Sequence, residues 1–246
     1  MSVIWAGVWA LAGLMIGSVT LTLAAKQIRG MLTTSRPICL SCGAALSLRR
    51  WLPLTWLTDA GVCPACGDAD KRSRRTWELA VAAYFVLALV ILGGEMYAAR
   101  LIFASLPLLL ILAIDLKTQA VFVQHCYVAV VAGLFLGLTE GASEAANSMA
   151  GMVLALAVAA LFLLITRWLY RSMHVRTLPM GLSDLYVAAA MGALVRADAL
   201  MPALVAAVTL AAAYRIVVPV FRPRSRSRLA PLGPFLCIGG LVALAI

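Results

Sequence analysis

The sequence predicts an all-α polytopic membrane protein, with about eight transmembrane helices and a small cysteine-containing module between the first two. Three observations predict this fold. The 246 residues are 64% hydrophobic and only 12% charged, with a mean hydropathy of +1.01. A soluble domain of this size needs more charge on its surface, so lipid is the expected surrounding. Apolar runs recur along the chain, and two C-x2-C pairs stand between the first run and the second.

Each apolar run approaches the roughly 20 residues that one helix needs to cross a bilayer. No Lys or Arg precedes the first run, so we expect a retained helix there rather than a cleavable signal. The third run is short and contains Pro107, so its helix could end early or continue past Ile114. The expected spans are 3–25, 77–92, 101–114, 120–138, 150–166, 178–195, 202–221 and 231–246.

The distribution of basic residues predicts that the N-terminus lies on the outer, non-cytoplasmic side of the membrane. With that orientation the inner loops hold 17 of the 20 Lys and Arg residues, Arg215 lies near the inner end of its span, and only Arg100 and Arg196 lie outside. Cytoplasmic loops carry the excess of Lys and Arg, so this orientation is preferred and explains most of the net charge of +10. The basic loop RPRSRSR, residues 222–228, is explained more simply by attraction to anionic lipid than by binding to nucleic acid, and no nucleic-acid partner is expected. The inner loops are 26–76 with nine basic residues, 115–119 with one, 167–177 with three, and 222–228 with four.

The four cysteines of the first inner loop predict a structural zinc site. They are Cys39, Cys42, Cys63 and Cys66, which form two C-x2-C pairs separated by twenty residues. A reducing cytoplasm disfavours disulfides, and four thiolates at this spacing can complete a closed tetrahedral zinc shell. Gly43 and Gly67 each follow a second cysteine, where a turn often needs positive φ. Such a site can fold a loop that has too little core to fold alone.

Two aspartates are the main candidates for chemistry, because an ionisable residue within a span is costly and often functional. Asp115 follows LLLILAI at the end of the third run, and Asp184 lies about two helical turns into the span that starts at 178. Both are expected near the inner face, where they can meet. Two carboxylates in a poorly solvated site cannot both ionise easily, which leaves an acid and a base around one water, as in aspartic proteases.

The residues alone leave alternatives open. Asp115 could instead pair with Lys117 or Arg176 in an interfacial charge cluster. Glu78 could extend toward the inner interface or line the site. Cys126 and Cys237 lie in apolar spans and are expected to be packing residues.

Several segments, in their order along the chain, carry a family resemblance. They are Gly17-Ser18 in the first span, the cysteine loop with its central Pro53, the segment RRTWELAVAAYF, the pair Ile114-Asp115, the motif Gly181-Leu182-Ser183-Asp184, and PLGPFLCIGG near the end. Together they resemble the type IV prepilin peptidases, which are polytopic aspartic proteases of the bacterial inner membrane. The GLSD motif is similar to the Gly-x-Gly-Asp of that family, and PLGPF to its closing segment.

The resemblance implies that Asp115 and Asp184 are the catalytic pair. It implies cleavage of a short basic leader, after a Gly and at the cytoplasmic face, from type IV prepilins or type II secretion pseudopilins. Many members then N-methylate the new terminus with S-adenosylmethionine. The chain is expected in the bacterial inner membrane with a periplasmic N-terminus, a cytoplasmic zinc module, and prepilins and the lipid bilayer as partners.

The chain also departs from the family pattern, as a divergent member would. Ser183 stands at the second Gly of the motif, and Tyr186 stands where a Lys usually follows the second Asp. Two other classes of function are weighed against the peptidase: an inactive assembly factor of a pilus or secretion system, and an ion-coupled transporter using the two Asp residues. The expected domains are 1–25, the first helix; 26–76, the zinc module; and 77–246, the membrane-embedded peptidase domain.

Overall fold

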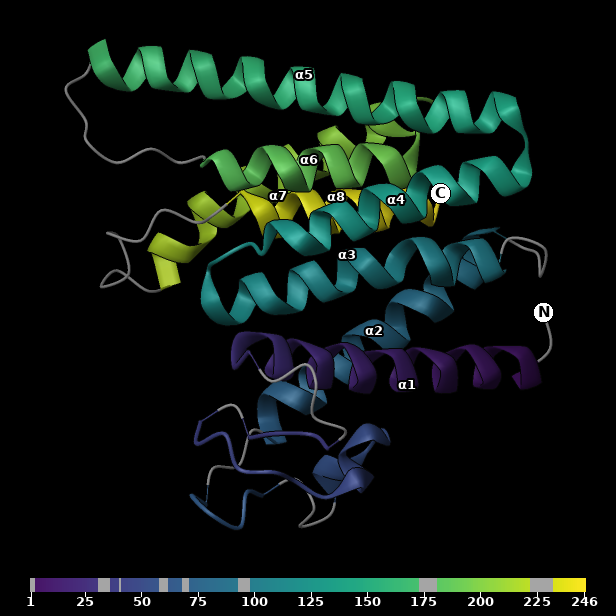
Figure 1. Cartoon of the computed structure of the whole chain (residues 1–246), viewed down its shortest axis with the longest axis vertical. Helices are drawn as coiled ribbons and strands as arrows, with labels where there is room; N and C mark the ends of the chain where they lie inside the picture. The colour runs from purple at the N-terminus through teal and green to yellow at the C-terminus, as the bar shows by residue number, and fades with distance from the viewer. Residues whose placement is uncertain are drawn as a thin grey trace. The chain divides into compact units, whose positions relative to one another are not determined.

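The computed structural model describes residues 3–30, 36–39, 41–57, 62–67, 71–92, 98–172, 181–221 and 232–246. Across these residues the protein is all-helical, with eight α-helices and two short 3-10 helices (Figure 1). The predicted fold class is confirmed. The elements are α1 (Val3–Ile28), η1 (Leu48–Trp51), η2 (Thr55–Leu57), α2 (Lys71–Leu92), α3 (Ala98–Thr118), α4 (Val123–Glu140), α5 (Ala142–Ser172), α6 (Leu182–Val195), α7 (Leu200–Phe221) and α8 (Gly233–Leu244).

Each predicted span corresponds to one of these α-helices. Of the described helices, α1, α3, α4, α5 and α7 are long and apolar enough to cross a membrane, and α6 and α8 are shorter apolar helices. α2 begins with a basic turn and becomes apolar after Glu78. The loop 222–228, for which lipid was expected as a partner, lies outside the described residues.

The chain forms two compact units, residues 1–99 with 245–246, and residues 100–244. In the first unit α1 packs along α2. A side chain on Gly13 would strike the backbone of Ala82, so this close approach needs a residue without a Cβ. Nearby, the rings of Trp9 and Phe85 stack with centroids 6.0 Å apart. The three-part division expected from the sequence follows membrane topology and stays a prediction.

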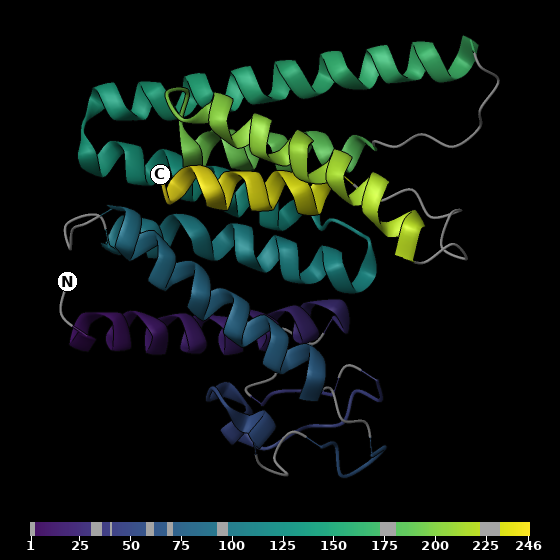
Figure 2. The same cartoon turned by 180° about the vertical axis from the view of Figure 1, so that it is seen from behind.

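The second unit is built around α6, which packs against α4, α5 and α8, while α7 lies mainly against α8 (Figure 2). Nine of the 14 residues of α6 are buried, including Asp184 and the run from Ala190 to Val195. Gly192 of α6 and Gly151 of α5 touch through their backbones, and a Cβ on either would collide with the other helix. Small residues therefore bring α6 to the centre of the unit.

An ion-pair cluster holds the C-terminal end of α6. Arg196 ends this helix and is 4% exposed. Its guanidinium donates to the carboxylates of Glu140, at the end of α4, and Glu144, in the first turn of α5. Arg100 also reaches Glu140, with 3.5 Å between Nε and Oε1. The cluster lies at the opposite end of α6 from Asp184.

Candidate functional site

Asp115 and Asp184 lie at helix ends in the second unit and are both buried, 2% and 5% exposed. α3 continues through Pro107 to Thr118, so Asp115 lies in the last helical turn rather than at the start of a loop. α6 begins at Leu182, and Asp184 therefore lies in its first turn, not two turns inside as the sequence suggested. The end of one helix thus faces the beginning of another.

Gly233 brings the two carboxylates together. It is the first residue of α8, in the PLGPF segment. A Cβ on Gly233 would collide with Asp115 Oδ2 and would lie 3.3 Å from Asp184 Oδ1. The two carboxylates therefore both lie against Gly233, where a side chain would not fit. Two buried acids placed in this way are a candidate pair for acid–base hydrolysis.

The two carboxylates have different surroundings. Asp184 Oδ2 accepts a hydrogen bond from the Gly181 N–H at 2.8 Å, and the Gly233 N–H also interacts with this carboxylate. These donors belong to the starts of α6 and α8, where helices carry partial positive charge. Asp115 Oδ2 is buried and accepts no hydrogen bond from the described residues. Asp115 also lies near the negative end of α3.

The alternative role of Asp115 as a member of an interfacial charge cluster finds no support among the described residues, where Asp115 forms no ion pair. Arg176, one of the two expected partners, lies outside the described residues. Asp115 instead interacts electrostatically with Asp184.

The two departures from the family motif are accommodated locally. Ser183 lies inside α6 and does not have positive φ, so a side chain at this position causes no backbone strain. Tyr186 is 39% exposed and contacts Tyr127 of α4 edge-on, with ring centroids 6.0 Å apart. Neither residue displaces Asp184.

The four predicted metal ligands cluster in the first unit. The Sγ atoms of Cys39, Cys42, Cys63 and Cys66 all lie within 4.8 Å of one another. Two pairs join the two C-x2-C turns, at 3.7 Å between Cys39 and Cys66 and 3.6 Å between Cys42 and Cys63. No disulfide joins the described cysteines. Cys126 and Cys237 are buried in helices outside this cluster, as expected for packing residues.

The two C-x2-C turns have the same construction. The Gly43 N–H donates to the Cys39 carbonyl and the Gly67 N–H to the Cys63 carbonyl, both at 2.9 Å. Both glycines have positive φ, 78° and 68°, as the sequence predicted. The two similar turns thus hold the four thiols close to one another.

The cluster fits a tetrahedral metal ion. Zn–S bonds of about 2.3 Å in a tetrahedron imply sulfur–sulfur distances of about 3.8 Å, close to the two spacings observed. Hydrogen bonding from the Cys66 backbone lowers the pKa of the Cys63 thiol to about 6, which favours the thiolate that a metal requires. The module has a very small apolar core, Cys39, Leu46 and Cys63 with Ala44 against it. A bound ion would supply the stability that this core lacks.

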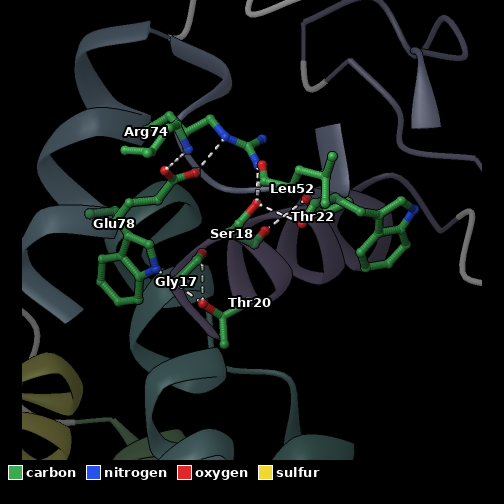
Figure 3. Close-up of polar contacts among 10 residues, drawn as sticks. Gly17, Ser18, Thr20, Thr22, Leu52, Arg74 and Glu78 are labelled. Carbon is green, nitrogen blue, oxygen red and sulfur yellow. Dashed lines mark hydrogen bonds and ion pairs between the residues drawn. The ribbon is translucent and has the colours of Figure 1, made fainter. Parts of the chain in front are cut away.

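A buried polar network joins the module to α1 and α2 (Figure 3). Glu78 is fully buried and pairs with Arg74 at 2.8 Å, and its other oxygen accepts the Leu54 N–H at 2.8 Å. Arg74 also donates to Ser18, whose hydroxyl donates to the carbonyls of Trp51 and Leu52 at 3.0 Å. Among the described residues, the Glu78 carboxylate fastens the module to its helices, a contact that the sequence did not predict.

The residues of this network stand in segments that the sequence analysis singled out, but their contacts with one another were not predicted. Ser18, Arg74 and Glu78 all lie in segments that carry the family resemblance, Gly17-Ser18 and RRTWELAVAAYF. The i, i+4 spacing of Arg74 and Glu78 was the available signal for an ion pair on one helix face. Their contact with the 48–57 segment depends on the fold and could not be read from spacing.

Comparison with known proteins gives one match. No curated protein and no solved structure matches the chain. Residues 11–92 match the family model described as the bacterial peptidase A24 N-terminal domain. This segment contains most of α1, the four-cysteine module and α2. The match covers 82 of the 246 residues and supports the predicted resemblance to the prepilin peptidases.

Proposed function

We propose that the protein is an aspartic endopeptidase that removes the short basic leader from type IV prepilins or type II secretion pseudopilins at the cytoplasmic membrane face. The observation that carries the proposal is the convergence of Asp115 and Asp184 on Gly233. The A24 match to residues 11–92 supports the peptidase class.

The surroundings of the two carboxylates suggest their roles. Asp184 accepts a backbone N–H at the start of α6, so it is the better candidate for the ionised base that deprotonates water. Asp115, with an oxygen unpartnered among the described residues, is the candidate for the protonated acid that polarises the scissile carbonyl. It would then protonate the leaving amine. Burial of both groups strengthens these electrostatic effects.

The cysteine cluster holds a structural zinc ion in this proposal. Four thiolates close the coordination shell, so the ion stabilises the module and leaves the hydrolysis to the aspartates. The protein would lie in the bacterial inner membrane with its N-terminus in the periplasm and the module in the cytoplasm. A pilin held in the same membrane by its apolar segment would present its leader on that side.

The test is co-expression of the chain with a prepilin. Wild type should shorten the prepilin, seen as a gel shift, and Asp115→Asn and Asp184→Asn should each leave it full length. Mass spectrometry of the mature N-terminus should place the cut after a Gly. Cleavage that persists in both variants would overturn the proposal. The same spectrum shows whether the terminus is methylated, since no described residue identifies an S-adenosylmethionine site.

The assay also separates the rival functions. An inactive assembly factor would leave the prepilin uncut in the wild type while still being required for pilus or secretion assembly. A transporter that used Asp115 and Asp184 as an ion relay would show ion flux in vesicles without any cleavage.

A further inference from the structure

The segment from Leu48 to Leu57 presents an apolar surface that the zinc module and the A24 match leave unexplained. Four of its leucines are exposed, from 36% to 67% of their side chains. Exposed leucines grouped on one short segment are costly in water and mark a surface that contacts something apolar. This leucine surface consists of Leu48, Leu52, Leu54 and Leu57.

The leucine surface is built into the fold rather than carried on a loose loop. Ser18 donates to the carbonyls of Trp51 and Leu52, and the buried Glu78 carboxylate accepts the Leu54 N–H (Figure 3). Leu54 has φ of 62°, a left-handed conformation that leucine rarely adopts. Lys26 lies over the Trp51 ring, 4.7 Å from its centroid. The segment is therefore held in one position on α1 and α2.

Its anchors mark the level of the membrane boundary. α2 changes from the basic run KRSRRTWE to an apolar sequence directly after Glu78. On α1, Ser18 lies ten residues before the helix ends at Ile28, about 15 Å along the axis and in the C-terminal half of this helix. The segment is thus anchored beside the point where α2 changes from basic to apolar sequence.

Among the described residues of 26–78, every exposed charged side chain is basic. These residues are Arg29, Arg36, Arg49, Arg72 and Arg75. Arginine binds phosphate oxygens well, and leucines beside arginines fit the boundary between headgroups and acyl chains. We propose that the 48–57 segment inserts its leucines into the membrane interface, where Arg49 of the same segment binds anionic phospholipid headgroups.

Spin-label depth measurement tests this on the full zinc-loaded chain in lipid nanodiscs. A nitroxide is placed at Leu52→Cys or Leu57→Cys, with Ala45→Cys as the exposed control within the module. Wild type treated with the same spin label measures the signal that comes from the native cysteines. In discs containing phosphatidylglycerol, dissolved oxygen should relax the labels at 52 and 57 several-fold more than a water-soluble nickel chelate does, with the reverse at 45.

The anionic component is tested separately. Replacing phosphatidylglycerol with phosphatidylcholine, or introducing Arg49→Glu, should make the labels at 52 and 57 shallower. Only backbone atoms of Arg49 take part in η1, so this change leaves the helix intact. Insertion of equal depth in both lipids would overturn the anionic assignment. Labels at 52 and 57 that behave like the label at 45 would overturn insertion, and labels protected from both reagents would show that protein covers the surface instead.

Discussion

Gly233 stands where the Asp115 and Asp184 carboxylates meet, and a single methyl group there would collide with Asp115. Gly233 does not have positive φ, so the backbone itself accepts alanine. Gly233→Ala should therefore displace the Asp115 carboxylate and lower leader cleavage by roughly 100-fold, the effect of misplacing a reacting group by about 1 Å. Initial cleavage rates of a prepilin in detergent measure the change.

Gly7→Ala is the matched control, because a Cβ on Gly7 meets nothing within 4 Å. It should cleave at the wild-type rate. Wild-type cleavage by Gly233→Ala would show that the site does not use the point where the two carboxylates converge.

The Arg74–Glu78 pair gives a second prediction at this scale. Both side chains are buried, at 7% and 0% exposure. Arg74→Met leaves the Glu78 carboxylate buried without this cation, which costs about 3–5 kcal/mol and should lower the midpoint of thermal unfolding in detergent. Arg74→Met combined with Glu78→Gln removes the charge but keeps an acceptor for Leu54, so part of the stability should return. Arg72→Met, at an exposed position, should unfold like wild type; equal midpoints for all three variants would contradict the prediction.

Residues whose chemistry restricts their type stand out from the amino-acid sequence alone. The four cysteines at metal-binding spacing do cluster, and the catalytic role of the two aspartates in apolar runs stays a prediction. Gly233 does not, since in the sequence it is one residue of the PLGPF motif and its role arises from the side chains that surround it. The contact of Glu78 with Leu54 could not be predicted either, because Leu54 belongs to a different segment.

At the scale of elements, the cysteine module should depend on its metal. The wild type should contain one zinc per chain, and Cys39→Ser or Cys63→Ser should release it. With a core of so few residues, the metal-free module should become several-fold more sensitive to limited proteolysis between α1 and α2. Elemental analysis and protease digestion measure the two effects.

Cys126→Ala is the control for the metal, because Cys126 is buried in α4 and lies outside the cluster. This variant should keep one zinc per chain. A purified wild type without zinc, or a Cys39→Ser variant that retains it, would rule out the four-sulfur site.

The existence of each helix could be predicted from apolar runs, whereas helix ends could not. α5 was expected over 150–166 but extends over Ala142–Ser172, because Glu144, Arg167 and Arg171 continue the helix beyond its apolar part. At α6 the opposite occurred, since the apolar run began at 178 and the helix begins at Leu182. This difference moved Asp184 into the first turn, where helix N–H groups are available to it.

For the whole molecule, the two basic residues expected outside are also the two that form the ion-pair cluster at the C-terminal end of α6. Arg100 and Arg196 both contact Glu140, and Arg196 also contacts Glu144. Their charge is therefore balanced locally, whereas the basic residues of the inner loops far outnumber the acidic ones. The predicted orientation rests on the number of Lys and Arg residues in the inner loops, because cytoplasmic loops carry their excess.

Reporter fusions test this orientation. Alkaline phosphatase needs disulfides and is active only in the periplasm, whereas green fluorescent protein fluoresces in the cytoplasm. A fusion after Gly141, between α4 and α5, should give phosphatase activity, and fusions after Ile28 or Ser172 should give fluorescence. Because Asp115 lies at the end of α3 that precedes α4, the same pattern would place the carboxylate pair on the cytoplasmic side, as the proposed function requires. The opposite pattern would place the cysteines in an oxidising compartment, without the reducing conditions that favour zinc over disulfides. It would also place the two aspartates on the side of the membrane away from a cytoplasmic leader, which contradicts the proposed function.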